Sequence, residues 1–213
     1  MSQIKYYLKR ITPPVFQDWH TTYNLNRKYK KASKFLKNAD KLHLACGTNV
    51  INNWHNVDLF ESPEVIYWDL TDKRFPVEDN TINLIFCEHF IEHIDLNQGY
   101  IFLKNCFNAL KKSGSIRIST PDLNKIIQCY LQKNLTEWSD VGFIAQSPCR
   151  LLDDSVRLWG HQFIYDEDEL TDLMSRVGFK NIRRMQWHKS EIKEFNGLEC
   201  RPYHNDLILE ADK

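Results

Sequence analysis

The sequence predicts an α/β fold: one three-layer α/β/α sandwich built on a mostly parallel sheet and preceded by a helical arm over residues 1–39. First, short apolar runs separated by turn-forming residues begin at Lys41 and are typical of buried strands. Second, a helical pattern lies between two of these runs, which indicates a right-handed crossover between parallel strands. Third, 42% hydrophobic and 26% charged residues match an ordinary globular domain, so 213 residues suit one domain.

The first 39 residues are polar, aromatic and basic. Pro13 and Pro14 divide them into a short arm and a helix expected over about residues 15–37. The stretch from Arg27 to Lys37 carries six Lys or Arg and no acid. A solvated helix face is the first interpretation of this charge, and an anionic partner is the alternative.

The remaining 174 residues (40–213) alternate between strand-like and helix-like patterns. Strands are expected at 41–46, 54–59, 64–68, 82–87, 115–119, 179–187 and 206–211. A helix over 100–111 has apolar residues at three- and four-residue spacing and is expected to end by Gly114, and a second over 166–178 has an acidic first turn. Residues from about 134 to 165 show little periodicity, which predicts an inserted lid or substrate region.

Charge and cysteine content exclude several classes of protein. The net charge is zero, so the chain lacks the basic footprint of a nucleic-acid-binding protein. No apolar run is long enough for a membrane span, and the first residues lack the apolar core of a signal peptide. The six cysteines form no C-x-x-C pair, and no metal centre is expected from them. Scattered thiols without a leader predict a reduced, cytoplasmic protein.

Small and acidic residues follow the first strands of the predicted sheet. Ala45, Cys46 and Gly47 form a small-residue turn after the first strand, where a ligand can approach the backbone closely. Taken alone, this motif is weak evidence for a ligand site and favours an ordinary tight turn. Acids also stand at strand ends, namely Asp58, Asp69 and Glu88. Because the carboxyl ends of parallel strands share one edge, these carboxylates could accept hydrogen bonds from ribose hydroxyls or an exocyclic amine there.

The order of these motifs resembles a family of class I S-adenosylmethionine (SAM) dependent methyltransferases, of the methyltransferase type 11-like kind. The resemblance covers roughly residues 40–125 and 160–211. The motifs are KLHLACG at 41–47, WHNVDL at 54–59, WDL at 68–70, FPVEDN at 75–80, EHFIEH at 88–93, ALKKSG at 109–114, STPD at 119–122 and GF at 178–179. The resemblance implies a Rossmann-like, mostly parallel seven-stranded sheet whose last strand is antiparallel, with SAM as cofactor and S-adenosylhomocysteine (SAH) as product.

The resemblance also implies roles for individual residues. The first turn would lie against the methionine part of SAM, the acid after the second strand would bind the ribose, the next acid would lie by the adenine, and the fourth strand's end would lie near the methyl. The implied cofactor-binding residues are Ala45, Cys46, Gly47, Asp58, Leu59, Asp69, Leu70, Cys87, Glu88 and His89.

Methyl transfer to a hydroxyl needs a group that accepts its proton, and histidine suits this role near neutral pH. His89 and then His161 are the candidate catalytic residues. The expected reaction is O-methylation of a small-molecule or carbohydrate acceptor. Residues 1–39 could cap the cofactor, shape the acceptor pocket or form a homodimer contact.

Two alternatives stay open. Thr48, Asn49 and Val50 follow Gly47 where methyltransferases commonly have further glycines, and only nine residues (47–55) separate Cys46 from Asn56. A parallel crossover normally needs a dozen or more residues, so the first helix must be a stub. This departure leaves a non-catalytic binding module as one alternative.

The second alternative concerns the sequence from His89 to His93, which reads H-x-x-E-H. On a helix, His89 and His93 would share a face and could bind zinc, with Glu92 as base, which predicts a zinc hydrolase.

Overall fold

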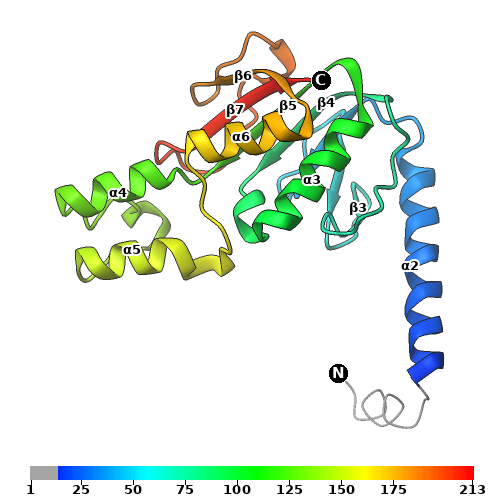
Figure 1. Cartoon of the computed structure of the whole chain (residues 1–213), viewed down its shortest axis with the longest axis horizontal. Helices are drawn as coiled ribbons and strands as arrows, with labels where there is room; N and C mark the ends of the chain where they lie inside the picture. The colour runs from blue at the N-terminus through cyan, green and yellow to red at the C-terminus, as the bar shows by residue number, and fades with distance from the viewer. Residues whose placement is uncertain (1–13) are drawn as a thin grey trace.

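The computed structural model describes residues 14–213, with side chains from Tyr23 onward, and the predicted arm over 1–13 lies outside this range. All seven expected strands are present (Figure 1). The helices and strands are α2 (Pro14–Leu36), β1 (Lys41–Leu44), β2 (His55–Asp58), β3 (Val65–Tyr67), β4 (Ile82–Glu88), α3 (Leu96–Ala109), β5 (Leu110–Thr120), α4 (Leu123–Gln132), α5 (Pro148–Arg157), α6 (Glu167–Val177), β6 (Lys180–Arg184) and β7 (Leu207–Asp212). Short 3-10 helices are η1 (Ile91–His93), η2 (Ser139–Val141), η3 (Leu158–Gly160) and η4 (Lys193–Phe195).

The strands form one seven-stranded sheet in the order β3-β2-β1-β4-β5-β7-β6. Strands β1 to β5 pair in parallel, and β7 is antiparallel to both β5 and β6. This arrangement confirms the expected mostly parallel, Rossmann-like sheet with a reversed last strand. From β1 the chain builds the sheet outwards in one direction through β2 and β3, and it then continues on the other side of β1 with β4 and β5. The topological switch point therefore lies between β1 and β4, at their carboxyl ends.

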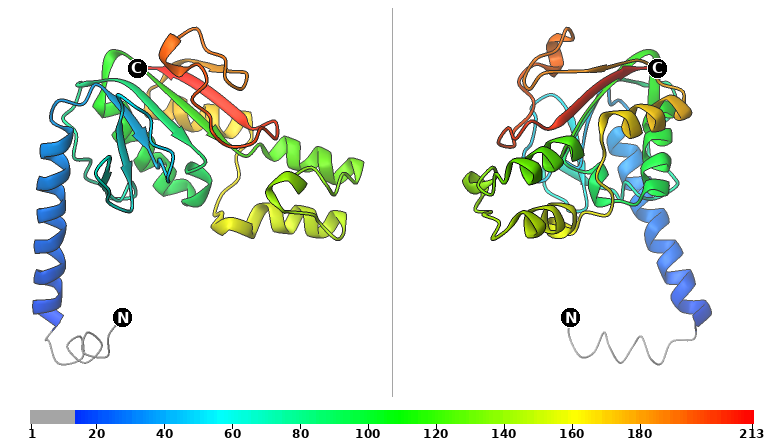
Figure 2. Two further views of the ribbon diagram at one scale, coloured as in Figure 1. Left: turned by 180° about the vertical axis from the view of Figure 1, so that it is seen from behind. Right: turned by 60° about the vertical axis from the view of Figure 1, so that its left-hand side comes forward.

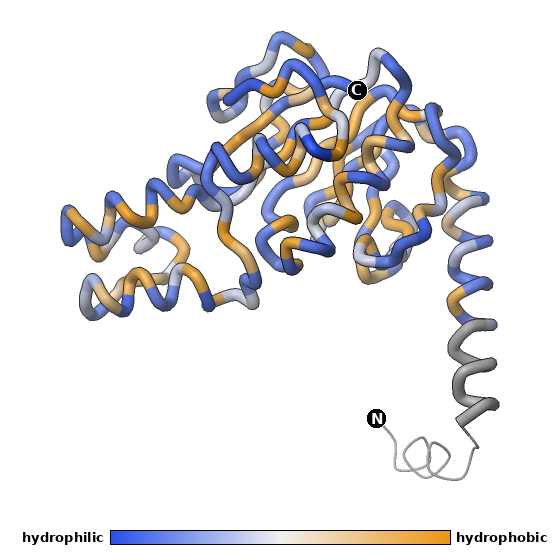
Figure 3. Tube along the Cα trace, in the orientation of Figure 1, coloured by the Kyte–Doolittle hydropathy of each residue, from blue (hydrophilic) through white to orange (hydrophobic). Residues whose placement is uncertain are grey.

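The main core lies between the sheet and helices α3 and α6, which pack on each other and on one face of the sheet. Apolar residues run along the strands through the middle of the molecule in Figure 3. Side chains alternate along β4: Ile85 and Cys87 face this core, whereas Leu84 and Phe86 face the opposite side. The α3 helix begins at a capping box on Asp95 and ends at Ala109, so the expected stop at Gly114 is wrong, because that glycine lies inside β5.

Within residues 14–213, the opposite layer is built from irregular segments and the short helix η4. Phe86 of β4 packs there against Trp54, from the β1–β2 connection, and Phe195, from the long β6–β7 connection. The sequence predicted a short helical stub in the β1–β2 connection, but residues 45–54 form only turns. The guanidinium of Arg117 fastens the β6–β7 connection to β5: Nε lies 2.5 Å from Oε1 of Glu199, and its Nη atoms donate to the backbone oxygens of Gln186 and Lys189.

Helices α4 and α5 project together from the carboxyl edge of the sheet, away from α2 (Figure 2). They share a second, smaller core of Ile126, Cys129, Ala145, Leu151 and Ile164. The sequence predicted an irregular lid over about 134–165, but the structure places α5 there. Both helices begin with capping residues that the sequence analysis did not use. Asp122 caps α4, and Ser147 caps α5, with Pro148 at its first helical position. We name residues 123–165 the helical lobe.

The α2 helix confirms the helix expected over 15–37 and packs at the β3 edge of the sheet. Its basic side chains contact that edge: Nζ of Lys28 lies 3.7 Å from the ring centre of Tyr67, and Lys31 pairs with Glu61. Among the described residues, no helix has the length and apolar character needed to cross a lipid bilayer.

Candidate functional site

The turn after β1 adopts a conformation that L-residues rarely take. Ala45 has a φ of 54° and Gly47 a φ of 55°, both in the left-handed region. A Cβ placed on Gly47 would meet no atom within 4 Å, so the space in front of this turn is open. The Cys46 side chain is buried, and burial raises the pKa of its thiol to about 12. The thiol therefore stays protonated at neutral pH, and the backbone is the part of this turn that can contact a ligand.

Asp58 ties the end of β2 to this turn. Its Oδ2 lies 2.8 Å from the amide nitrogen of Gly47, and its Oδ1 lies 2.6 Å from the amide nitrogen of Leu59. A carboxylate has about four acceptor positions, so two remain for a ligand. Leu59 and Phe60 are 60% and 39% exposed, which leaves an apolar platform beside the acid. The structure therefore brings three predicted cofactor residues, Gly47, Asp58 and Leu59, to one place.

Asp69 and Leu70 follow β3, beyond the β2 end. Oδ1 of Asp69 accepts hydrogen bonds from the amide (2.9 Å) and hydroxyl (2.6 Å) of Thr71, which forms a local turn. Its Oδ2 accepts none from the part of the chain that the structure describes. Leu70 is 4% exposed and belongs to the main core. Of this predicted adenine-binding pair, Asp69 keeps a carboxylate oxygen available, whereas the Leu70 side chain faces inward.

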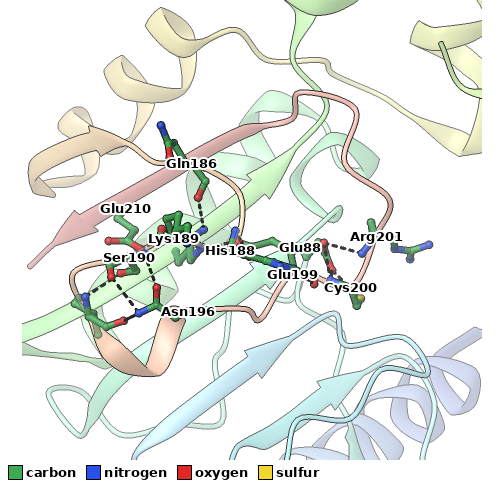
Figure 4. A network of polar contacts seen from close by, with 12 residues as sticks. Glu88, Gln186, His188, Lys189, Ser190, Asn196, Glu199, Cys200, Arg201 and Glu210 are labelled. Atoms are coloured by element: carbon green, nitrogen blue, oxygen red, sulfur yellow. Dashed lines mark hydrogen bonds and ion pairs between the residues drawn. The ribbon is translucent and has the colours of Figure 1, made fainter.

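The two residues that end β4 have other partners. Cys87 is buried in the main core, so its side chain lies on the face of the sheet that α3 and α6 cover. Side chains alternate between the two faces along a strand, so Glu88 takes the other face. Glu88 lies on the opposite side, where its carboxylate accepts hydrogen bonds from the amides of Cys200 and Arg201 at 3.1–3.2 Å (Figure 4). The thiol of Cys200 adds a third contact at 2.8 Å. Glu88 therefore holds the β6–β7 connection in place, a role that the sequence did not suggest.

His89 follows β4 with a φ of 51° and lies between two carboxylates. Its Nε2 lies 3.2 Å from Oδ2 of Asp206, and its Nδ1 lies 3.3 Å from Oε1 of Glu92. Burial favours the neutral ring, but the two carboxylates outweigh it and raise the pKa of His89 to about 10. The same contact lowers the pKa of the buried Glu92. His89 is thus a cation at neutral pH, with both ring nitrogens engaged.

A cavity of about 330 Å³ lies beyond β4 and β5, between the sheet edge and the helical lobe. Four histidines line it, namely His89, His93, His161 and His204. Its walls include the aromatic side chains of Trp138 and Trp159. Polar groups among aromatic walls are typical of a small-molecule site.

His161 enters this cavity from the end of η3. Its Nδ1 lies 3.0 Å from the backbone oxygen of Ser155. Because a carbonyl only accepts, Nδ1 carries the hydrogen and Nε2 keeps its lone pair. Burial lowers the pKa of His161, which favours this neutral form.

The H-x-x-E-H sequence does not form the helix that the zinc hydrolase hypothesis requires. His89 has a left-handed backbone, and only Ile91–His93 are helical, as the 3-10 helix η1. His89 and His93 therefore do not share a helix face. His89 is paired with Asp206 instead, a residue that the sequence did not single out. Because β7 is antiparallel, the residue before it lies at the edge where β4 ends, and this was the signal available in the sequence.

The sheet order defines a doubly wound α/β protein, a class in which ligands usually bind beyond the carboxyl ends of the strands, where the acids of this chain lie. No protein-family model matches the chain, and no curated protein matches it significantly. Among solved structures, a SAM-dependent methyltransferase from Archaeoglobus fulgidus is similar over 90% of this chain and 94% of its own, with 16% identity and a TM-score of 0.51. Methyltransferases from Thermotoga maritima (16% identity, covering 93% and 96%) and Mesorhizobium loti (14%, covering 83% and 91%) each have a TM-score of 0.48. The chain therefore has the fold of SAM-dependent methyltransferases.

Proposed function

We propose that this protein is a SAM-dependent methyltransferase that methylates a hydroxyl of a small-molecule or carbohydrate acceptor. The observation that carries the proposal is the arrangement at the switch point. Asp58 is held beside the open turn at Gly47, and the cavity lies on the neighbouring side, beyond β4 and β5. In a doubly wound sheet this edge is where ligands bind, so a cofactor crevice and an acceptor cavity adjoin each other.

The residues of the crevice fit SAM. The backbone of Ala45, Cys46 and Gly47 leaves room for the methionine part, and Asp58 has acceptor positions for ribose hydroxyls. The exposed side chain of Leu59 offers an apolar surface for the base. When bound, SAM supplies an activated methyl group on a sulfonium, so the protein mainly aligns donor and acceptor.

The acceptor's proton needs a partner in the cavity. His161 has a lone pair on Nε2, because its Nδ1 hydrogen is directed to Ser155. His89 has a carboxylate beside each ring nitrogen, which leaves no free nitrogen to accept a proton. We therefore reverse the order of the two predicted catalytic residues. His161 is the proton acceptor when the protein holds no metal ion, and His89 positions the carboxylates of Glu92 and Asp206.

Trp138 and Trp159 in the cavity wall support an acceptor with an apolar face, such as a sugar ring or an aromatic ring. A cytoplasmic location stays a prediction from the cysteines, all six of which are free. A homodimer through the α2 helix likewise stays a prediction.

Calorimetric titration with SAM and SAH, on protein treated with a chelator, tests the proposal. We expect saturable one-to-one binding of both compounds, followed by transfer of label from methyl-labelled SAM to members of a sugar and phenol panel. Absence of binding at millimolar ligand would rule out the methyltransferase.

That negative result would favour the non-catalytic binding module. The contact that supports this second candidate is the engagement of Glu88 by Cys200 and Arg201, which commits one acid of the edge to the protein's own backbone.

A further inference from the structure

Three side chains from two separate segments come together beside the cavity: His93 and His161 line it, and Glu92 is fully buried. Glu92 and His93 belong to η1, and His161 follows η3. One ligand atom from each of the three lies within 4.8 Å of the others. We name these three residues the Glu92 cluster. None of its members serves the cofactor crevice.

The carboxylate of Glu92 is buried with its two oxygens in different surroundings. Glu92 is 0% exposed, and its Oε2 accepts a hydrogen bond of 2.9 Å from the hydroxyl of Thr120. Its Oε1 has no hydrogen-bond donor among the described residues. Ring nitrogens of His89 (3.3 Å) and His93 (3.8 Å) approach it only at ion-pair distance. This oxygen lies beside the His89 cation but accepts no hydrogen bond from the described residues, so its lone pairs remain able to coordinate a metal ion.

His161 is oriented as a metal-bound histidine is. A metal-bound histidine usually directs its other ring nitrogen to a carbonyl or carboxylate, and Nδ1 of His161 is directed to the carbonyl of Ser155. The hydroxyl of Thr120 orients the Glu92 carboxylate in the same manner. Backbone hydrogen bonds hold the two segments together, because the amides of Gln162 and Phe163 donate to the backbone carbonyl oxygen of Glu92 at 2.7 and 3.2 Å.

We propose that Glu92, His93 and His161 bind a divalent transition-metal ion. Two imidazoles and one carboxylate suit Zn²⁺, and three protein ligands leave a further position for water or a hydroxyl. Two ligand atoms on one Zn²⁺ lie about 3.4 Å apart, and rotation of the half-buried histidine side chains closes the remaining distance. This site differs from the H-x-x-E-H hypothesis, because His89 is not a ligand and no hydrolysis is involved.

The open position faces the cavity, where the acceptor would bind; this role rests on the proposed methyltransferase function, whereas the metal site itself does not. A hydroxyl bound to a metal ion loses its proton more readily than a free one. With the ion in place, Nε2 of His161 is a ligand, and the ion takes over the activation of the hydroxyl from the histidine.

Metal binding is tested with Zn²⁺ and Co²⁺ on tag-free, chelator-treated protein. We expect one tightly bound equivalent of Zn²⁺ by elemental analysis, and a Co²⁺ absorption spectrum typical of a four-coordinate site. Mutating groups that only orient ligands typically weakens metal binding about 10- to 100-fold, so His161→Gln and His93→Gln, which remove direct ligands, should weaken it at least that much. His204→Gln is the matched control, because His204 lines the same cavity outside the cluster.

Binding below one equivalent, or binding that the ligand variants leave unchanged, would overturn the proposal. Thr120→Val provides a check that keeps all three ligands, and we expect it to weaken Zn²⁺ binding about 10-fold. SAM binding by the chelator-treated protein is measured separately. Loss of the metal site with SAM binding intact removes only this inference, whereas metal binding without SAM binding removes the proposed function and leaves the metal site standing.

Discussion

The amide nitrogen of Gly47 lies 2.8 Å from Oδ2 of Asp58, so the turn after β1 and the end of β2 are joined by a charge-assisted hydrogen bond. This bond stands in the place where most doubly wound folds have a helix, because the β1–β2 connection here is too short for one. The bond fixes the position of the Asp58 carboxylate relative to the open turn at Gly47. The same carboxylate therefore has a structural partner and acceptor positions left for a ligand.

Asp58→Asn is expected to weaken SAM binding about 10- to 100-fold, since hydrogen bonds to a charged group contribute about 1.5–3 kcal/mol. The amide keeps the shape of the side chain but loses the charge and half of the acceptor capacity. Calorimetric titration measures the change. Glu64→Gln is the control, because this exposed acid lies on the β2–β3 connection and should leave SAM affinity unchanged. Equal affinities for all three proteins would show that Asp58 does not contact the cofactor.

Arg117→Met is expected to destabilise the protein by about 3–5 kcal/mol, because it leaves the buried carboxylate of Glu199 without a cation and removes one of the two arginines that pair with Glu210. Urea unfolding measures the loss. Arg157→Met removes an exposed pair with Asp153 and should change the stability by less than about 1 kcal/mol. If Arg117→Met changed the free energy of unfolding as little as Arg157→Met does, the β6–β7 connection would be held by its apolar residues alone.

Gly99→Ala is expected to destabilise the protein although alanine is the better helix former. A Cβ at Gly99 would lie 2.7 Å from the hydroxyl oxygen of Tyr165, which is buried and has no hydrogen-bond partner among the described residues. Overpacking costs about 1–3 kcal/mol, against a gain of about 1 kcal/mol in helix propensity. Tyr165→Phe removes the obstructing oxygen, so in its background Gly99→Ala should become neutral or stabilising. An unchanged cost in the double variant would contradict the proposed clash.

His43 makes the folded protein sensitive to mild acid. Burial lowers the pKa of His43 to about 4, although its contact with Asn56 and the charge of Asp58 oppose the shift. The unfolded chain therefore binds the proton first, and stability falls as the pH drops from the ordinary histidine value of about 6.5 towards 4. The loss amounts to about 3 kcal/mol at most. Above pH 6.5, about the ordinary histidine pKa, this contribution is fully present.

His43→Gln has no such titration, so urea unfolding between pH 7 and 4 should show a flatter dependence than in the unchanged protein. The glutamine amide can still contact Asn56, which limits the direct effect of the substitution at neutral pH. Parallel pH profiles for the two proteins would mean that the acid sensitivity comes from other groups.

The sequence by itself determined the strands, the helices α2, α3 and α6, and the edge at which the small and acidic residues meet. These features depend on local periodicity, on turn residues and on the rule that parallel strands end on one side. It did not reveal α4 and α5, because the caps at Asp122 and Ser147 were the main local signals. It also could not show that Cys87 faces the core or that Glu88 is bound by the β6–β7 connection.

Only the tertiary structure decided which polar groups meet. His89 and Asp206 are 117 residues apart in sequence, and Arg117 and Glu199 are 82 apart. His161 joins Glu92 only because the chain returns from the helical lobe beside η1. The path of the β6–β7 connection and of the lobe follows from packing against the finished sheet, which no local pattern encodes. The physical reason is that local propensity fixes the backbone of an element, whereas the partners of its side chains depend on contacts made across the whole fold.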